Sequence, residues 1–220
     1  MRKDKREIVV RGIGKATTPP DLIIIEMTLE TTEKDYEKTI AKATEHLDEL
    51  WEAVCSAGHG QNDLKTTRFN VNTKFEQYRE KDAWKSRFVG YTCTHGLSLE
   101  FSLDMALLGS TLGSIGKCKA NPKFTIRFTV KDPTAISEQL LENAVENAKK
   151  KATVLAKSAG VNLGEIKRID YNWSELHMYS NTNYSMESDV KYMALEEAPM
   201  DIVPEDIDLT DTAAITWGIE

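Results

Sequence analysis

Apolar and polar residues alternate in several stretches of the chain, a period of two that is typical of β-strands with one buried face. The clearest stretches are residues 7–13, 22–30, 64–78, 89–103, 123–131, 164–173 and 207–219. Apolar residues instead recur every three or four positions after Thr32 and again after Asp132-Pro133, as they do in amphipathic helices. A shorter helix, interrupted by glycines, is expected over residues 104–116.

The two long helical stretches end in the same tripeptide, Ser56-Ala57-Gly58 and Ser158-Ala159-Gly160. Glycine readily adopts the left-handed conformation that ends a helix, so each tripeptide predicts a helix stop. A strand-like segment precedes and follows each helix, which indicates two βαβ units separated by a strand-rich middle. We therefore expect an α+β fold of the two-layer sandwich type, with antiparallel sheets packed on two long helices and one short helix.

A length of 220 residues suits one large domain or two small ones. We expect a single unit over residues 1–220, built from two interlocked α/β sandwiches. One would comprise about residues 1–62 with 161–220, and the other residues 63–160. Residues 179–204 lose all periodicity and contain asparagines, prolines and acids, so a long mobile loop is predicted there.

The alternating stretch over residues 89–103 is unusually long for a strand. Fifteen residues at about 3.3 Å each would span roughly 50 Å. The strand is therefore expected either to bend at Gly96, as at a β-bulge, or to project beyond the core. A projecting hairpin offers a surface for strand pairing, so we predict a homo-oligomer formed through the 64–103 hairpin.

The charge balance argues against a nucleic-acid partner. The chain has 28 lysines and arginines against 35 aspartates and glutamates, a net charge of −7, whereas nucleic-acid binding generally needs a basic stripe. The basic cluster Lys149-Lys150-Lys151 lies in a helical stretch that also carries Glu142 and Glu146, as solvated helix faces do. The longest apolar run, residues 22–25, is far short of the ~20 residues of a membrane span, so no transmembrane segment is expected.

The N-terminal residues are basic and lead directly into Ile8-Val9-Val10, without the apolar region of a signal peptide. Three cysteines, at no spacing typical of a disulfide framework, fit a reducing compartment. We expect a cytoplasmic location for this sequence as written, or a periplasmic or extracellular one if an export signal has been removed.

The segment Gly12-Ile13-Gly14 follows a strand, but Thr17 stands where a dinucleotide-binding fingerprint has its third glycine. A proline-rich turn and another strand follow it, so we interpret it as a kinked edge strand. No cofactor is predicted.

Two Cys/His pairs, Cys93 with His95 and Cys55 with His59, are the only hints of metal or thiol chemistry. A zinc site needs three or four clustered ligands, and neither pair has a further partner nearby in sequence. No metal site is therefore predicted.

Four residues are candidates for lining a ligand pocket: His177, Tyr179, Trp173 and His95. The first three lie around the predicted loop and either line a pocket or pack the loop onto the body, and we favour packing. His95 interrupts an apolar stripe, where a hydrogen-bonded buried histidine is expected ahead of a catalytic one. The sequence contains no GxSxG, P-loop or HExxH motif, so no catalytic residue is predicted.

Short motifs occur in a characteristic order along nearly the whole chain: Ile8-x-Val10-x-Gly12-x-Gly14, Pro20-Asp21, Gly90-Tyr91, Ala120-Asn121 (with Lys119 in place of a glycine), the helix Ala144 to Gly160, and Leu163-Gly164. In these motifs the chain resembles the SIMPL domain family. The resemblance implies no agreed biochemical activity and no established catalytic residue. It also implies an association with oxidative-stress defence, an envelope or periplasmic location, and large ring-like homo-oligomers.

Two functional hypotheses follow. The first is a non-enzymatic self-assembling or binding protein linked to stress defence, supported by the long hairpin and the lack of a catalytic motif. The alternative is a small-ligand-binding protein or an enzyme whose pocket lies beside the 174–206 loop, near His177 and Tyr179.

Overall fold

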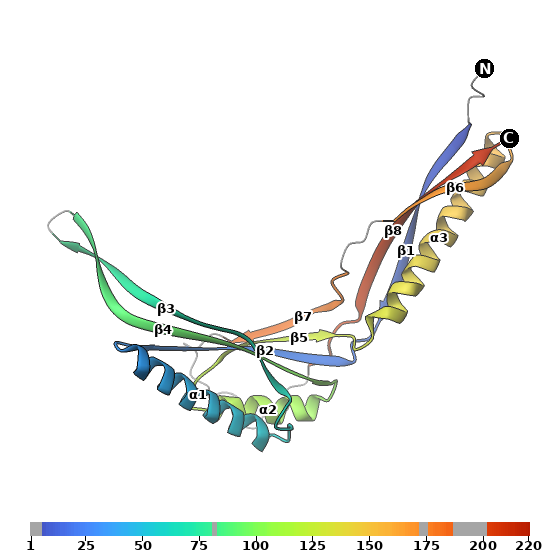
Figure 1. Ribbon diagram of the computed structural model, residues 1–220. Coiled ribbons are helices and arrows are strands. Elements are labelled where there is room, and N and C mark those ends of the chain that lie inside the picture. Colours follow the sequence, from blue (N-terminus) through green and yellow to red (C-terminus); the bar gives the residue numbers. More distant parts are fainter. Residues whose placement is uncertain (1–5, 81–82, 172–175, 187–201) are drawn as a thin grey trace. The chain divides into compact units, whose positions relative to one another are not determined.

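The computed structural model describes residues 6–80, 83–171, 176–186 and 202–220. It has three helices and two antiparallel sheets, which confirms the predicted α+β class (Figure 1). Contacts within the chain define two compact units. We call Asp21–Phe128 with Thr182–Pro204 the central unit, and Met1–Pro20 with Thr129–Asn181 and Glu205–Glu220 the terminal unit. The expected division into two interlocked sandwiches, residues 1–62 with 161–220 and residues 63–160, stays a prediction.

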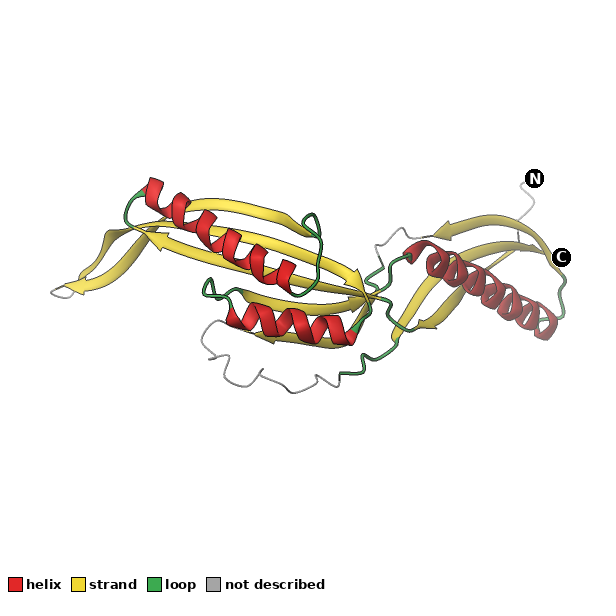
Figure 2. Ribbon diagram, turned by 90° about the horizontal axis from the view of Figure 1, so that it is seen from below, coloured by secondary structure: helices red, strands yellow, loops and turns green. Residues whose placement is uncertain are grey.

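The central unit is built on a five-stranded sheet with the order β3-β4-β2-β5-β7. Its strands are β2 (Leu22–Glu33), β3 (Leu64–Glu80), β4 (Ala83–Ser102), β5 (Lys123–Thr129) and β7 (Tyr179–Met186). Helices α1 (Tyr36–Ser56) and α2 (Met105–Lys117) lie on the same face of the sheet (Figure 2). The core of this unit therefore lies between one sheet face and two helices.

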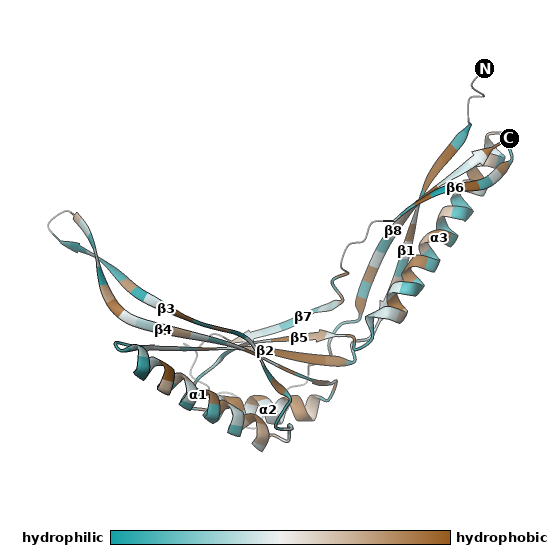
Figure 3. Ribbon diagram, in the orientation of Figure 1, coloured by the Kyte–Doolittle hydropathy of each residue, from teal (hydrophilic) through white to brown (hydrophobic). Residues whose placement is uncertain are grey.

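Strict alternation explains why only one sheet face is buried. In β2, Ile23, Ile25, Met27 and Leu29 are buried, and the residues between them face the other side of the sheet. The helices contribute Leu50 and Val54 from α1 and Leu108, Leu112 and Ile115 from α2 to the same core. Figure 3 shows apolar and polar residues following one another along α1.

The prediction of a loop over residues 179–204 is wrong for its first part, because residues 179–186 form strand β7. Ser180 is buried and Thr182, Tyr184 and Met186 are half-buried, whereas the residues between them are exposed. This alternation is hard to recognise in the sequence because serine, threonine and asparagine occupy most positions of the strand. Pairing at the sheet edge supplies the order that local propensity does not.

The first predicted βαβ unit is β2–α1–β3, whose two parallel strands flank β4 in one sheet. The second has the same element order, β5–α3–β6, but its two strands belong to different sheets. Both helices end as expected: Gly58 and Gly160, which follow them, have φ angles of +112° and +70°.

The terminal unit consists of a three-stranded sheet and helix α3 (Pro133–Ser158). The strands are β1 (Glu7–Thr18), β6 (Leu163–Tyr171) and β8 (Ile207–Ile219), in the antiparallel order β1-β8-β6. A stripe of α3 that is buried against the sheet consists of Leu140, Ala144, Ala148, Ala152 and Ala156. Small residues at this spacing let the helix lie close to the strands.

The glycines of the Gly12-Ile13-Gly14 segment mark the point of closest approach between β1 and α3. A Cβ atom on Gly12 would lie 1.8 Å from the carbonyl oxygen of Ala144, and one on Gly14 would lie 1.9 Å from that of Leu140. Both distances are far below any van der Waals contact. The two glycines therefore permit close helix–strand packing.

Because α3 lies so close, its side chains reach the outer edge of β1. Asn143 Nδ2 donates a hydrogen bond to the carbonyl oxygen of Lys15 (3.0 Å), and Asn147 Oδ1 accepts one from the backbone N–H of Ile13 (3.0 Å). Lys151 Nζ donates to the carbonyl oxygen of Arg11 (3.2 Å). Side chains from three successive turns of the helix thus form hydrogen bonds with backbone groups of β1. In an edge strand such groups are otherwise free to pair with another strand.

Replacing Gly12 with alanine tests this close packing. The methyl group must push α3 away from β1, so G12A is expected to lower the free energy of unfolding by about 3 kcal/mol. Urea denaturation followed by circular dichroism measures the change. The matched control is G109A in α2, where an added Cβ meets no atom within 4 Å and helix propensity favours alanine by about 1 kcal/mol. Equal effects of the two substitutions would contradict this account.

Candidate functional site

His95, one of the predicted pocket residues, is buried in β4 and has partners within the central unit. Its Nε2 atom forms a hydrogen bond with the Thr66 hydroxyl (2.9 Å), and its ring packs edge-on against Phe69, with 5.2 Å between ring centroids. Burial lowers the pKa of His95. These contacts are those of a neutral histidine whose side chain links β4 to β3.

His177 and Tyr179 are both exposed, because they alternate with residues that anchor this segment of the terminal unit. The buried neighbours are Met178, whose carbonyl oxygen accepts a hydrogen bond from Thr129, and Ser180, whose hydroxyl donates to the carbonyl oxygen of Glu205 (2.7 Å). Trp173 lies outside the described residues. His95 belongs to the central unit and the other two to the terminal unit. A ligand pocket formed by these residues stays a prediction.

Two further histidines also form hydrogen bonds with threonine. The Thr111 hydroxyl donates its one proton to the carbonyl oxygen of Leu107 (2.7 Å), so it must accept from Nε2–H of His59 (2.7 Å). Burial lowers the pKa of His59. His46 Nδ1 lies 2.9 Å from the hydroxyl of Thr31, which is buried. These histidines connect helices α1 and α2 to their neighbours in the central unit.

The cysteines lie in the central unit as free thiols. Burial raises the pKa of Cys93. Burial, and then the Glu49 carboxylate, raise the pKa of Cys118. A raised pKa keeps a thiol protonated and unreactive at neutral pH. Within the described ranges, no three His, Cys, Asp or Glu side chains are grouped as metal ligands would be.

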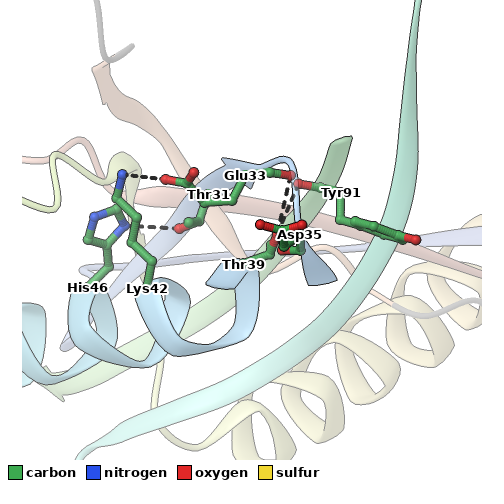
Figure 4. Close-up of polar contacts among 7 residues, drawn as sticks. All are labelled: Thr31, Glu33, Asp35, Thr39, Lys42, His46 and Tyr91. Carbon is green, nitrogen blue, oxygen red and sulfur yellow. Dashed lines mark hydrogen bonds and ion pairs between the residues drawn. The ribbon is translucent and has the colours of Figure 1, made fainter. Parts of the chain in front are cut away.

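The β3–β4 hairpin extends well past the first turn of α1, and a polar network holds the chain where it leaves the core (Figure 1). Thr39 in α1 donates to the carbonyl oxygen of Asp35 (2.9 Å) and also approaches that of Tyr91 (3.4 Å) in β4. Lys42 Nζ binds Glu33 Oε1 at 2.8 Å and thereby lowers the pKa of Glu33 (Figure 4). The start of α1 is thus fixed to both β2 and β4 at the root of the hairpin.

Beyond this root, an aromatic ladder runs outward along the hairpin. Ring centroids are 5.7 Å apart for Tyr36 and Tyr91, 5.4 Å for Tyr91 and Phe88, and 5.7 Å for Phe88 and Phe75, all in edge-to-face geometry. Phe75 is 59% exposed and Trp84, nearer the tip, is 72% exposed. Large aromatic side chains are therefore concentrated on a two-stranded ribbon that has no core of its own.

Two bulges shape the hairpin. Thr67 is an extra residue in β3 opposite Gly96, so the predicted irregularity at Gly96 is present, with the extra residue on the partner strand. Val89 is an extra residue in β4 next to Gly90. Gly90 has a φ of +157°, and a Cβ there would lie 2.2 Å from the carbonyl oxygen of Glu33. Both predicted alternatives, an irregularity and a projection beyond the core, occur together.

Three clefts lie near these elements. One of about 320 Å³ lies between α1 and the start of β3, and Leu47, Trp51, Leu64 and Thr66 are among its lining residues. One of about 380 Å³ lies between β1 and α3, at the side chains that cover the β1 edge. One of about 440 Å³ lies between α1 and α2, beside Glu49 and Cys118. The predicted pocket residues line none of these three.

Comparison with known proteins identifies the family. A family model named SIMPL, described as a protein of unknown function (DUF541), matches residues 8–217. The chain belongs to the SIMPL family. The resemblance seen in the sequence motifs is thereby confirmed over nearly the whole chain.

Relatives of this SIMPL protein include two Brucella proteins, each named "26 kDa periplasmic immunogenic protein". The proteins of Brucella melitensis and Brucella abortus are each 25% identical to the chain over 170 residues, which cover 77% of the chain and 68% of the relative. Their printed names state a periplasmic location, so the relatives do not support the expected cytoplasmic location. No helix in the described part of this SIMPL protein has the length and apolar character needed to cross a membrane.

Sequence reasoning located the hairpin but missed the ladder and the cleft. Tyr36 and Tyr91 are 55 positions apart in the chain and meet only because α1 starts beside β4. Phe75 lies in a predicted strand, but Phe88 lies just before the predicted strand 89–103, so the sequence did not predict their pairing. The cleft depends on the distance between α1 and β3, for which the sequence carries no signal.

The two buried histidines make stability depend on pH. In the unfolded chain they titrate near the usual pKa of about 6.5, whereas burial lowers the pKa of His59 and of His95 in the native state. The unfolded state therefore binds more protons below that pH, and the free energy of unfolding is expected to fall as the pH drops from 7.5 to 5.5. Urea denaturation at several pH values measures this slope.

Replacing both histidines with glutamine is expected to flatten the pH dependence between 7.5 and 5.5. The control is H177Q, which makes the same substitution at an exposed histidine. A double variant as steep as the wild type would show that other groups cause the pH dependence.

Proposed function

We propose that this SIMPL protein is a non-enzymatic protein that self-assembles through the β3–β4 hairpin. The observation that carries the proposal is the exposed ladder. Every described residue from Phe75 to Phe88 is exposed, including three large aromatic residues with more than two fifths of their surface in water. Contiguous exposed apolar surface of this kind is typical of interaction sites.

The internal contacts of the hairpin support an ordered surface. An isolated two-stranded ribbon is only marginally stable in water. Here Arg87 pairs with Glu76 across the strands (2.6 Å), Lys85 pairs with Glu80, and the Arg87 guanidinium lies 5.8 Å from the centre of the Tyr78 ring. Because these polar contacts already hold the ribbon together, its aromatic side chains are available to a second copy.

A second hairpin is a suitable partner for the first. Packing two ladders side by side would bury the aromatic rings of both copies, and one such contact uses the same residues on each side, as two-fold interfaces do. The same residues would also supply the rigid aromatic side chains that dominate interface energies. A periplasmic location is part of this proposal, supported by the printed names of the two relatives. The link to stress defence stays a prediction.

The alternative function, a ligand site beside the 174–206 loop, has less support. Most of this loop, residues 187–201, lies outside the described residues, so the three clefts described above do not test a pocket there. His177 and Tyr179 are exposed rather than gathered in a cleft. This alternative therefore stays a prediction.

The double substitution F75S/F88S tests the proposal. Burial of an aromatic side chain contributes about 1.5–3 kcal/mol, and each contact between two hairpins loses four such side chains, so self-association is expected to weaken by roughly ten-thousandfold or more. Sedimentation velocity over a range of protein concentrations measures the oligomer. The matched control is V154S, which removes a 64% exposed apolar residue from α3 in the terminal unit. A wild-type chain that stays monomeric at high concentration, or an unchanged F75S/F88S variant, would overturn the proposal.

A further inference from the structure

Strand β3 is an edge strand, and it is open to pairing along one side. It lies at the end of the order β3-β4-β2-β5-β7 and, among the described strands, pairs only with β4. The backbone N–H and C=O groups on its other side are a template to which an extended peptide can add as a further strand. By contrast, α3 side chains occupy the corresponding groups of β1.

On its helix side, the first part of β3 borders the cleft of about 320 Å³. Leu64 and Thr66 form the strand wall, Leu47 and Trp51 form the helix wall, and the buried Leu97 lies between them. Trp51 is held in place by a hydrogen bond from its Nε1 to the carbonyl oxygen of Gln61 (3.2 Å). The cleft lies between a helix and an edge strand, and its lining also includes the polar residues Asp48 and Gln61. Its apolar residues can contact apolar side chains of an added strand.

On the opposite sheet face, β3 carries three exposed cations, Lys65, Arg68 and Lys74. Their direct partners across the strand are Ser98, Gly96 and Gly90, and the exposed Glu100 lies two positions from Ser98 on the same face of β4. In the described part of the chain none of the three takes part in an ion pair. Other cations on this sheet face are paired: Lys123 with Glu30 and Arg127 with Glu26. The row on β3 is thus an unneutralised positive strip.

We propose that the β3 edge binds an extended segment of another protein, by strand addition, in which apolar and acidic residues alternate. Successive side chains of a strand point to opposite faces. One set would therefore enter the cleft beside Trp51, while the other set would lie over Lys65, Arg68 and Lys74. Backbone hydrogen bonds to the edge supply affinity, and the two faces select the sequence pattern.

Among the described strands, a second copy of the chain does not offer such a segment. Residues 206–211 have the required alternation of acids with Ile207 and Leu209, but they lie at or beside the start of β8, which is paired on both sides by β1 and β6. Of the edge strands, β7 carries no acid, β6 mixes acids with bases, and β3 itself is basic. Charge complementarity therefore favours a different, acidic protein as the partner.

This inference is independent of the self-assembly proposal. It uses the first part of β3, from Leu64 to Lys74, and the side of α1 that faces it. Self-assembly uses the aromatic residues from Phe75 onward. Either can fail while the other holds, and F75S/F88S is expected to leave peptide binding unchanged.

Fluorescence polarisation with a labelled eight-residue peptide of alternating valine and glutamate tests the inference on the full chain. Saturable binding is expected. Binding should be lost when alternate peptide amides are N-methylated, because strand addition needs them. It should also be lost when lysine replaces glutamate or when serine replaces valine. Failure of the valine–glutamate peptide to bind at millimolar concentration, or equal binding of the lysine peptide, would overturn the proposal.

Charge reversal on the protein gives the complementary test. R68E/K74E is expected to weaken binding of the valine–glutamate peptide about tenfold and to strengthen binding of the lysine peptide. The matched control is K149E/K157E, the same charge change at exposed positions of α3. If the two variants weaken binding equally, the peptide responds to the overall charge of the protein and not to the cations of β3, and the proposed site is wrong. If peptide affinity rises steeply when the protein is diluted, a second copy of the chain competes for the β3 edge. That result would overturn the choice of a different protein as the partner.

Discussion

The close approach of α3 to β1 is the constraint on which the terminal unit depends. Gly12 and Gly14 leave no side-chain volume between strand and helix, so the backbone of α3 rests directly on β1. Only at this separation can the side chains of Asn143, Asn147 and Lys151 reach past the strand to its outer backbone groups. The close approach of α3 to β1 thus forms the core of the unit and also prevents other strands from pairing with the β1 edge.

The central unit differs in that its sheet extends beyond the area that its two helices cover. The core residues of α1 and α2 bury one face of β2, β5 and the second half of β4. The hairpin continues beyond that cover, held at its root by Thr39 and by the Lys42–Glu33 pair. Exposed aromatic rings and an open edge strand are the physical consequences of this mismatch in length. The self-assembly surface lies on the uncovered part, whereas the β3 edge site begins beside α1.

Much of the fold followed from periodicity. The alternation in β2, β5 and β8 predicted strands whose buried residues are those of one face, and the Ser-Ala-Gly tripeptides marked the ends of α1 and α3. Strand β7 was missed because an edge strand rich in serine and asparagine owes its order to its neighbour rather than to its composition. For the candidate site, the sequence indicated the long hairpin and a hydrogen-bonded His95. It could not show the Thr66 partner, because the Thr67 bulge shifts the register between β3 and β4.

The sequence by itself determined the fold class, the family and the existence of the hairpin. These properties are carried by local patterns: period-two strands, helix stops and motifs in a set order. Only the tertiary structure decided which strands share a sheet, which edges stay open, and which side chains meet from distant positions, as Tyr36 and Tyr91 do. The physical reason is that edges and clefts arise from distances between elements, and those distances depend on packing volumes such as the missing side chains of Gly12 and Gly14.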